Sequence, residues 1–130
     1  MAFSVRHYLI ALVRPFPTNR DAEIRSQTKI YLCDTGLMRR FSRVPDGALF
    51  DNATWLALRQ RGQTGYFRKK SGVEIDFVVD GKIAFEIKQK ADAKDVSRLK
   101  QLAAELGLPE YRVVSRKWCE VENVIYGYQL

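Results

Sequence analysis

The 130-residue sequence has few of the side chains that bind soft metals or build a disulfide framework. It contains two cysteines, Cys33 and Cys119, and a single histidine, His7. The cysteines lack the close spacing of a zinc motif, and two distant thiols are typical of a reducing, cytoplasmic compartment. These counts argue against a cysteine–histidine zinc site and against a disulfide-rich secreted domain.

Long apolar runs are also missing. No stretch approaches the ~18 apolar residues that a membrane helix needs, and the first residues lack the apolar centre and cleavage site of a signal peptide. The sequence shows neither repeats nor low-complexity tracts. These absences predict a cytoplasmic, globular protein without a membrane partner.

The chain does have an excess of positive charge. It carries 22 lysines and arginines against 15 acidic residues, a formal net charge of +7. Such an excess favours a polyanionic partner, nucleic acid in particular. The basic residues cluster at Arg39–Arg40 with Arg43, and at Arg68–Lys69–Lys70. A solvated charged surface is the alternative interpretation of either cluster.

The apolar pattern predicts an α/β fold, with a mixed β-sheet flanked by helices. The proline and glycine within 43–47 mark an internal boundary, between an N-terminal extension (1–46) packed on the core and the core itself (47–130). Both belong to one structural domain. From residue 47 the expected order is helix, strand, strand, strand, helix, strand. The expected strands are 8–13 (or the end of a helix), 29–33, 64–69, 73–79, 83–88, 111–114 and 123–128; the helices are 35–38, 47–61 and 92–106, with a short helix or loop at 19–25.

The most informative segment is 71–88, where two alternating strands flank an Asp80-Gly81 turn. A two-residue loop would place Asp76 on the face of Phe85 and mix the apolar and polar faces, which a half-buried sheet resists. A three-residue loop or a bulge keeps the faces separate. We therefore expect residues 73, 75, 77 and 79 to share one face and residues 74, 76 and 78 the other. The expected opposed pairs are Val79 and Ile83, Phe77 and Phe85, and Asp76 and Glu86.

This register predicts a site for phosphodiester cleavage. Directly opposed residues have Cβ atoms ~4.5–5.5 Å apart, so the carboxylates of Asp76 and Glu86 could share one divalent cation, Mg²⁺ or Mn²⁺. Lys88 lies two residues beyond Glu86 on the same face and would act beside the metal. The alternative is a polar cluster of ion pairs, which contributes ~0–1 kcal/mol at a surface.

The order of elements and the Asp76-x9-Glu86-x-Lys88 pattern resemble the PD-(D/E)XK nuclease superfamily. The resemblance implies a restriction endonuclease-like core of order α-β-β-β-α-β and a Mg²⁺-dependent DNA endonuclease, a hydrolase of phosphodiester bonds. Asp51 matches the place where many members, including Holliday-junction resolvases, carry a helical acid, although it is one methylene shorter than the expected glutamate. Basic residues 68–70 would contact the phosphates of DNA.

A closer resemblance covers nearly the whole chain. Four motifs together are similar to a C-terminal domain of unknown function attached to prokaryotic AAA+-type ATPases. The implied partner is the ATPase domain. The given sequence has no Gly-x4-Gly-Lys-Ser/Thr motif and therefore no nucleotide site of that kind, so we expect the ATPase domain to be absent from this chain. The chain would then be an excised domain or a truncated gene product. The motifs are PFPTN at 15–19, KIYLCDTGL at 29–37, LFDN at 49–52 and SGVEIDF at 71–77.

Three functions remain open at this point. The chain is a metal-dependent DNA nuclease, a catalytically inactive nucleic-acid-binding module that delivers substrate to the ATPase, or a protein-interaction domain whose basic surface is incidental. Metal-dependent cleavage marks the first function, and salt-sensitive binding without cleavage marks the second.

Overall fold

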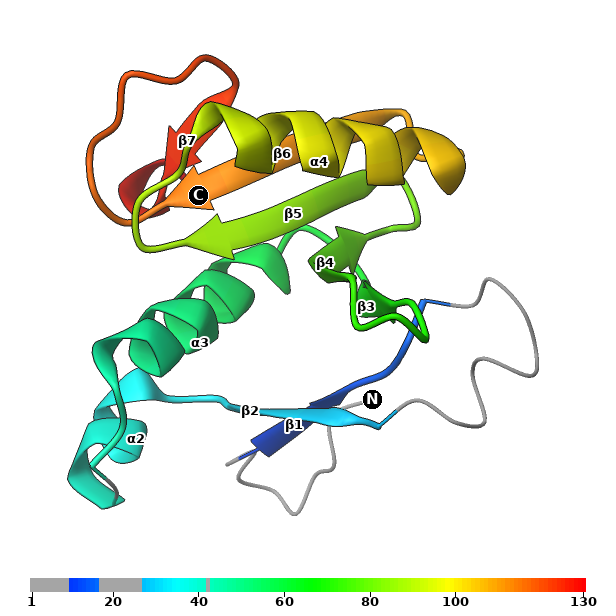
Figure 1. The fold of residues 1–130 in the computed structure, drawn as a ribbon. Helices are drawn as coiled ribbons and strands as arrows, with labels where there is room; N and C mark the ends of the chain where they lie inside the picture. The colour runs from blue at the N-terminus through cyan, green and yellow to red at the C-terminus, as the bar shows by residue number, and fades with distance from the viewer. Residues whose placement is uncertain (1–9, 17–26, 42) are drawn as a thin grey trace.

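The computed structural model describes residues 10–16, 27–41 and 43–130. The fold is mixed α/β, with a five-stranded and a two-stranded sheet flanked by helices (Figure 1). The segment 19–25, expected as a short helix or loop, lies outside the described residues. The elements are β1 (Ile10–Val13), β2 (Lys29–Leu32), α2 (Thr35–Phe41), α3 (Asp46–Leu58), β3 (Thr64–Arg68), β4 (Glu74–Val79), β5 (Ile83–Lys88), α4 (Ala93–Glu105), β6 (Glu110–Ser115), β7 (Val124–Tyr126) and the 3₁₀ helix η1 (Gly127–Gln129).

The large sheet has the strand order β3-β4-β5-β6-β7. Its first three strands are antiparallel, and β5, β6 and β7 run parallel to one another. Helix α4 connects β5 to β6 and covers one face, whereas α3 lies on the other side of β5 (Figure 1). The predicted order of helix, three strands, helix and strand from residue 47 onward is therefore confirmed.

The β4–β5 hairpin has the predicted three-residue loop. Asp80 and Gly81 adopt positive φ values of 52° and 62°, and the Lys82 amide donates to the Val79 carbonyl at 3.0 Å. The Asp-Gly sequence suits this left-handed backbone, because aspartate and glycine tolerate it best. The ladder pairs Val79 with Ile83, Val78 with Ala84, and Phe77 with Phe85.

The alternation expected along β4 is wrong in one respect, because the strand contains a bulge. Gly65 pairs with Val78 and Phe67 with Ile75, so two residues of β4, Asp76 and Phe77, lie opposite Tyr66 alone. An extra residue shifts the alternation of the strand beyond it. Ile75 therefore packs on the α4 side of the sheet with residues 73 and 78, while Phe77 and Val79 pack on the α3 side.

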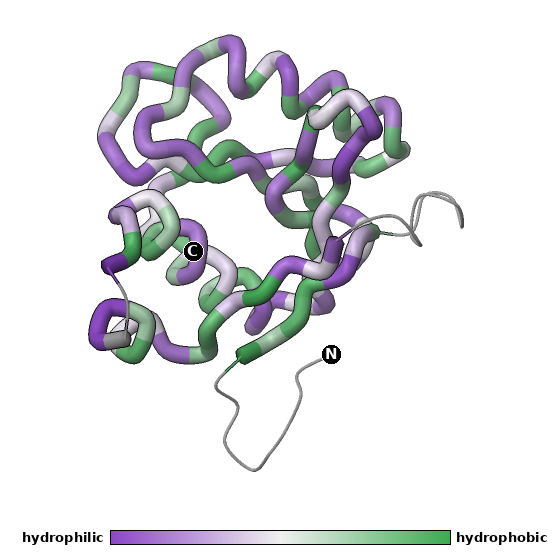
Figure 2. The backbone as a smooth tube through the Cα atoms, turned by 60° about the horizontal axis from the view of Figure 1, so that its bottom comes forward, coloured by the Kyte–Doolittle hydropathy of each residue, from purple (hydrophilic) through white to green (hydrophobic). Residues whose placement is uncertain are grey.

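The apolar core has one cluster on each side of the sheet. The α3 side buries Trp55 and Leu58 against Phe77 and Phe85. On the other side, the residues buried against the sheet include Leu99, Leu102 and Ala103 of α4. A capping box between Asp92 and Asp95 begins α4, each side chain accepting from the backbone of the other. Figure 2 shows apolar and polar stretches interspersed along the chain. None of the described helices is long and apolar enough to cross a membrane.

The β1–β2 hairpin is attached to the large sheet at β3. Tyr66 donates its amide to Arg14 at 3.2 Å, and its carbonyl accepts from the Phe16 amide at 2.6 Å. Ala11 and Val13 are buried in the same cluster as Trp55. The N-terminal hairpin thus covers part of the α3 side and part of the outer edge of β3.

Candidate active site at the β4–β5 fork

Glu86 is a buried carboxylate near the end of β5. Regular alternation places its neighbours Phe85 and Ile87 in the cluster on the α3 side, so Glu86 projects toward α4. Its Oε1 lies 2.9 Å from Lys88 Nζ and also forms an ion pair with Arg98 of α4. Lys88 in turn lies 3.4 Å from Asp95 Oδ1. Glu86 and Lys88 thus share a face, as predicted.

The second oxygen of Glu86, Oε2, has no hydrogen-bond partner among the residues that the structure describes. The residue is only 3% exposed, and within the described part of the chain its Oε2 makes no hydrogen bond. A buried charged oxygen without a partner is costly, because it has lost its water and gained nothing in return. An oxygen left open in this way is suited to a cation or an ordered water.

Asp76 lies where β4 and β5 separate. The ladder ends with the Phe77–Phe85 pair, and beyond it the Asp76 Oδ2 accepts a hydrogen bond from the Ile87 amide at 2.8 Å. Ile87 is the residue between Glu86 and Lys88. The Asp76 carboxylate therefore replaces a rung of the sheet and sits beside the Glu86-x-Lys88 segment. We call this junction the β4–β5 fork.

The expectation that the carboxylates of Asp76 and Glu86 face one another is not met in this structure. Glu86 projects toward α4, whereas the Asp76 charge acts on Tyr31, Lys29 and Asp51, which belong to β2 and α3. The bulge in β4 explains the difference, because it changes the direction of side chains at Asp76. The two carboxylates therefore lie on different sides of the sheet, Asp76 on the side that carries Phe85 and Glu86 on the side of α4.

Asp51 of α3, which the resemblance marks as the helical acid, lies near enough to Asp76 for the two charges to interact. Loss of hydration and the negative charge of Asp76 raise the pKa of Asp51 to about 6, although Lys29 opposes the rise. Burial raises the pKa of Asp76 too, against the opposing effect of the Ile87 hydrogen bond. Burial and Asp76 together push the pKa of the Tyr31 hydroxyl above its ordinary range. This side of the fork thus disfavours additional negative charge.

The basic run before the hairpin is partly used within the molecule. Lys69 forms an ion pair with Glu105 at 2.5 Å, and Arg68 lies 3.9 Å from Glu74, which also pairs with Lys29. Lys70 is exposed and has no ion pair among the residues that the structure describes. The three residues remain predicted phosphate contacts, but two of them would have to exchange partners.

Sequence reasoning missed Arg98 and Asp95, which complete the surroundings of Glu86 and Lys88. They lie three residues apart on α4 and therefore share a helix face. One signal could have indicated them: both are charged residues at the border of the amphipathic helix that follows the Glu-x-Lys strand. Their partners become apparent only when α4 packs against β5.

The donor set at the fork fits a hard cation better than a soft one. Within the described ranges, no group of three or more histidine, cysteine, aspartate or glutamate side chains gathers as a metal site. Mg²⁺, however, is commonly held by one or two carboxylates and keeps several waters. The open Oε2 of Glu86 suits that mode of binding as one ligand, whereas the Asp76 carboxylate faces the α3 side and would have to turn to supply a second.

The chain is thus an α/β domain with a cluster of charged residues at the β4–β5 fork, near the carboxyl end of β5. Residues 46–126 match the family described as "Domain of unknown function (DUF4143)". The match covers more than half of the chain, which therefore belongs to this family. No curated protein and no solved structure matches the chain.

Proposed function

We propose that this chain is a PD-(D/E)XK nuclease-like module that hydrolyses phosphodiester bonds in DNA with the aid of Mg²⁺ or Mn²⁺. The observation that carries the proposal is the buried, unpartnered Oε2 of Glu86 beside Lys88, one residue from the amide that binds Asp76. The order from α3 to β6 and the Asp76-x9-Glu86-x-Lys88 pattern support a restriction endonuclease-like core.

The fork residues have distinct roles in this proposal. Asp76 and Glu86 would hold the cation once the Asp76 carboxylate turns from the α3 side toward Glu86, and the bound cation would lower the pKa of a water and neutralise charge on the scissile phosphate. Lys88 would orient the attacking water or stabilise the charge that develops on the phosphate. Asp51, whose pKa of about 6 is coupled to Asp76, would accept a hydrogen bond from a water at the rim of the site.

The larger context follows from the four sequence motifs. We propose that the domain is the C-terminal module of a cytoplasmic AAA+-type ATPase, whose nucleotide-binding part is not in this sequence. The net charge of +7 supports a nucleic-acid substrate. Phosphate contacts by residues 68–70 would give affinity without reading the base sequence.

One observation favours a second candidate, a catalytically inactive module that binds nucleic acid or protein. Glu86 is paired with both Lys88 and Arg98. Two cations beside one carboxylate compensate the negative charge that a metal would otherwise neutralise, so the cluster can be stable without metal. The two candidates share the fold and differ in whether a cation takes the place of Arg98.

Plasmid nicking in the presence of Mg²⁺, Mn²⁺ or EDTA tests the proposal. Cleavage should require the metal, and Lys88→Ala should reduce it by about 10²–10³-fold, the usual effect of losing one charge-stabilising group. Lys90→Ala is the matched control, because this exposed lysine follows β5 two residues later and should leave the rate unchanged. Metal-independent nicking would contradict the proposed metal site, and no nicking under any of these conditions would favour the inactive module.

A further inference from the structure

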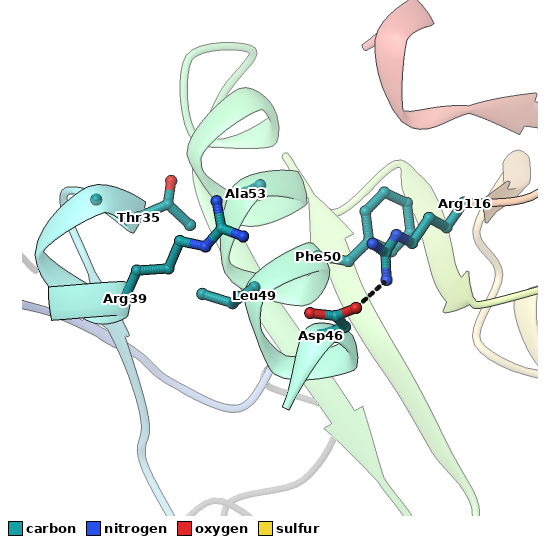
Figure 3. A pocket seen from close by; sticks show the side chains of 8 residues that line it. Thr35, Arg39, Asp46, Leu49, Phe50, Ala53 and Arg116 are labelled. Carbon is teal, nitrogen blue, oxygen red and sulfur yellow. Dashed lines mark ion pairs between the residues drawn. The ribbon is translucent and has the colours of Figure 1, made fainter. Parts of the chain in front are cut away.

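A groove lies between α2, α3 and the C-terminal end of the chain. It consists of two adjoining hollows of about 390 and 240 Å³, which share Phe50, Ala53 and Arg116 in their linings. Figure 3 shows Arg39 extending from α2 toward α3, and Arg116 reaching Asp46 from the other side. We call this feature the α2–α3 groove. Its size is within the usual range of ligand sites, about 300–1,000 Å³.

The groove carries more positive than negative charge. Arg39 and Arg116 line the larger hollow against one carboxylate, Asp46, which is exposed and lies 3.5 Å from Arg116. The Arg39 guanidinium makes no hydrogen bond or ion pair with any residue that the structure describes. Guanidinium groups bind phosphate oxygens through paired N–H donors. The chemistry therefore favours an anion that presents phosphates.

The smaller hollow contains a buried hydroxyl that no described residue satisfies. Thr54 lines it and is only 2% exposed, yet its Oγ1 makes no hydrogen bond within the described part of the chain. Burying a hydroxyl in this way is unfavourable unless a water or ligand satisfies it. This hydroxyl is independent of the arginines and indicates that the hollow takes a polar group.

Aromatic rings border the same hollow. Tyr128 is 85% exposed and stacks on Tyr126 with ring centroids 5.6 Å apart and an interplanar angle of 6°. Tyr128 and Phe50 both line the hollow. Exposed rings next to guanidinium groups are the usual means of binding single-stranded nucleic acid, because unpaired bases stack on them. A duplex keeps its bases stacked internally and has less use for such rings.

The groove adjoins the proposed catalytic strand. The Arg116 amide donates to the Lys88 carbonyl at 3.0 Å, and its guanidinium donates to Gln89 Oε1 at 3.2 Å. Both contacts lie at the carboxyl ends of the parallel strands β5 and β6, the edge where open α/β sheets bind ligands. A strand in the groove would thus pass next to the end of β5.

We infer that the α2–α3 groove binds a single-stranded segment of nucleic acid. Arg39 and Arg116 contact its phosphates, a base stacks on Tyr128, and Thr54 donates to a polar atom of the same nucleotide. The inference that a strand binds depends only on the groove. The further inference that this strand is the part of the substrate next to the cleaved bond rests on the proposed function.

Binding of a fluorescein-labelled dT₂₀ oligonucleotide to the 130-residue chain in EDTA tests this inference by fluorescence anisotropy. Arg39→Gln with Arg116→Gln should lower the slope of log Kd against log salt by about 1.4, because each single-strand phosphate contact contributes about 0.7. Tyr128→Ala should weaken binding by about 5- to 100-fold through lost stacking. Arg61→Gln with Lys100→Gln removes the same charge at exposed positions outside the groove and should leave the slope within error.

A 20-base-pair duplex distinguishes the groove from general attraction to charge. The inference requires the arginine and tyrosine variants to weaken dT₂₀ binding more than duplex binding while they retain the wild-type melting temperature. Equal losses for both DNAs, or an unchanged dT₂₀ slope, would overturn it. Groove-dependent binding without cleavage would sustain this inference and remove the nuclease. Metal-dependent cleavage with no effect of the groove variants would do the reverse.

Discussion

Glu86 and Asp76 lie on neighbouring strands, yet the protein surrounds them in opposite ways. Glu86 is enclosed by the cations Lys88 and Arg98, which favour its charged form. Asp76 is half-buried near Asp51, and its pKa is raised by burial. The sheet thus separates a compensated acid on the α4 side from a pair of acids with excess negative charge on the α3 side.

This contrast bears on how a cation would enter the fork. On the α3 side, a divalent cation would relieve the mutual repulsion of Asp51 and Asp76. On the α4 side, it would compete with Arg98 for Glu86.

The largest expected effect comes from removing the last rung before the fork. Phe85→Ala should destabilise the protein by about 3–5 kcal/mol, because the ring is buried against Phe77 and leaves a cavity. Urea denaturation followed by circular dichroism measures the change. Ile30→Ala removes an exposed side chain and should stay within about 0.5 kcal/mol. A loss below about 1 kcal/mol for Phe85→Ala would mean that the fork is not held by the core.

The next largest effect tests the ion pair between Arg98 and Glu86 on the α4 side of the sheet. Arg98→Ala should cost about 1.5–3 kcal/mol, because it removes a charged hydrogen-bonding partner from a buried carboxylate. The cost should shrink in a Glu86→Gln background, since a neutral amide no longer needs the guanidinium. Lys94→Ala, an exposed change on the same helix, is the control. Equal costs in both backgrounds would show that the two side chains are not coupled.

Metal binding gives a smaller, tunable effect. At a Mn²⁺ concentration ten times its Kd, binding to the folded state should stabilise the chain by about 1.4 kcal/mol, and EDTA should reverse the rise in melting temperature. Asp76→Asn and Glu86→Gln should each abolish that rise, whereas Lys88→Ala should retain it. If millimolar Mn²⁺ does not change the melting temperature of the wild type, the inactive module is favoured.

A further effect is a dependence of stability on pH that belongs to the α3 side. Because the folded pKa of Asp51, about 6, is above the unfolded value of ~3.9, the folded chain binds more protons between these two pKa values. The Asp51 contribution to stability is therefore greatest below the unfolded pKa, falls as pH rises through about 4–6, and is flat above. Asp51→Asn should remove this fall, as urea denaturation at pH 4, 5, 6 and 7 would measure. A fall of the same size in the variant would assign it to another group.

Local patterns were enough to predict much of the fold. The register of the β4–β5 hairpin followed from the Asp80-Gly81 turn and from the alternation of apolar residues on both strands, because these features act between chain neighbours. The start of α4 likewise depends on residues close together in the sequence, because Asp92 and Asp95 form its capping box. The predicted strand at 123–128 ends at Tyr126, since the chain turns into η1, and no local signal marked that change.

Local patterns could not predict the bulge at Asp76 and Phe77. A regular strand and a bulged one both place apolar residues of β4 on each face of the sheet. Packing decides the matter, since Tyr66 and Phe77 enter one cluster and Ile75 the other. The partners of the site residues were hidden for the same reason. Glu86 meets Arg98, and Asp76 comes near Asp51, only after α4 and α3 pack on opposite faces of the sheet.

The attachment of residues 14–16 to Tyr66 has a consequence for the behaviour of shorter versions of this protein. β3 is the outer strand of the five-stranded sheet, and the open backbone groups of such a strand can recruit a second chain into an intermolecular sheet. The contacts with Arg14 and Phe16 occupy both backbone groups of Tyr66. A version that begins after residue 16 would expose them, together with the side chains that Ala11 and Val13 cover, and we expect it to aggregate where the full chain does not.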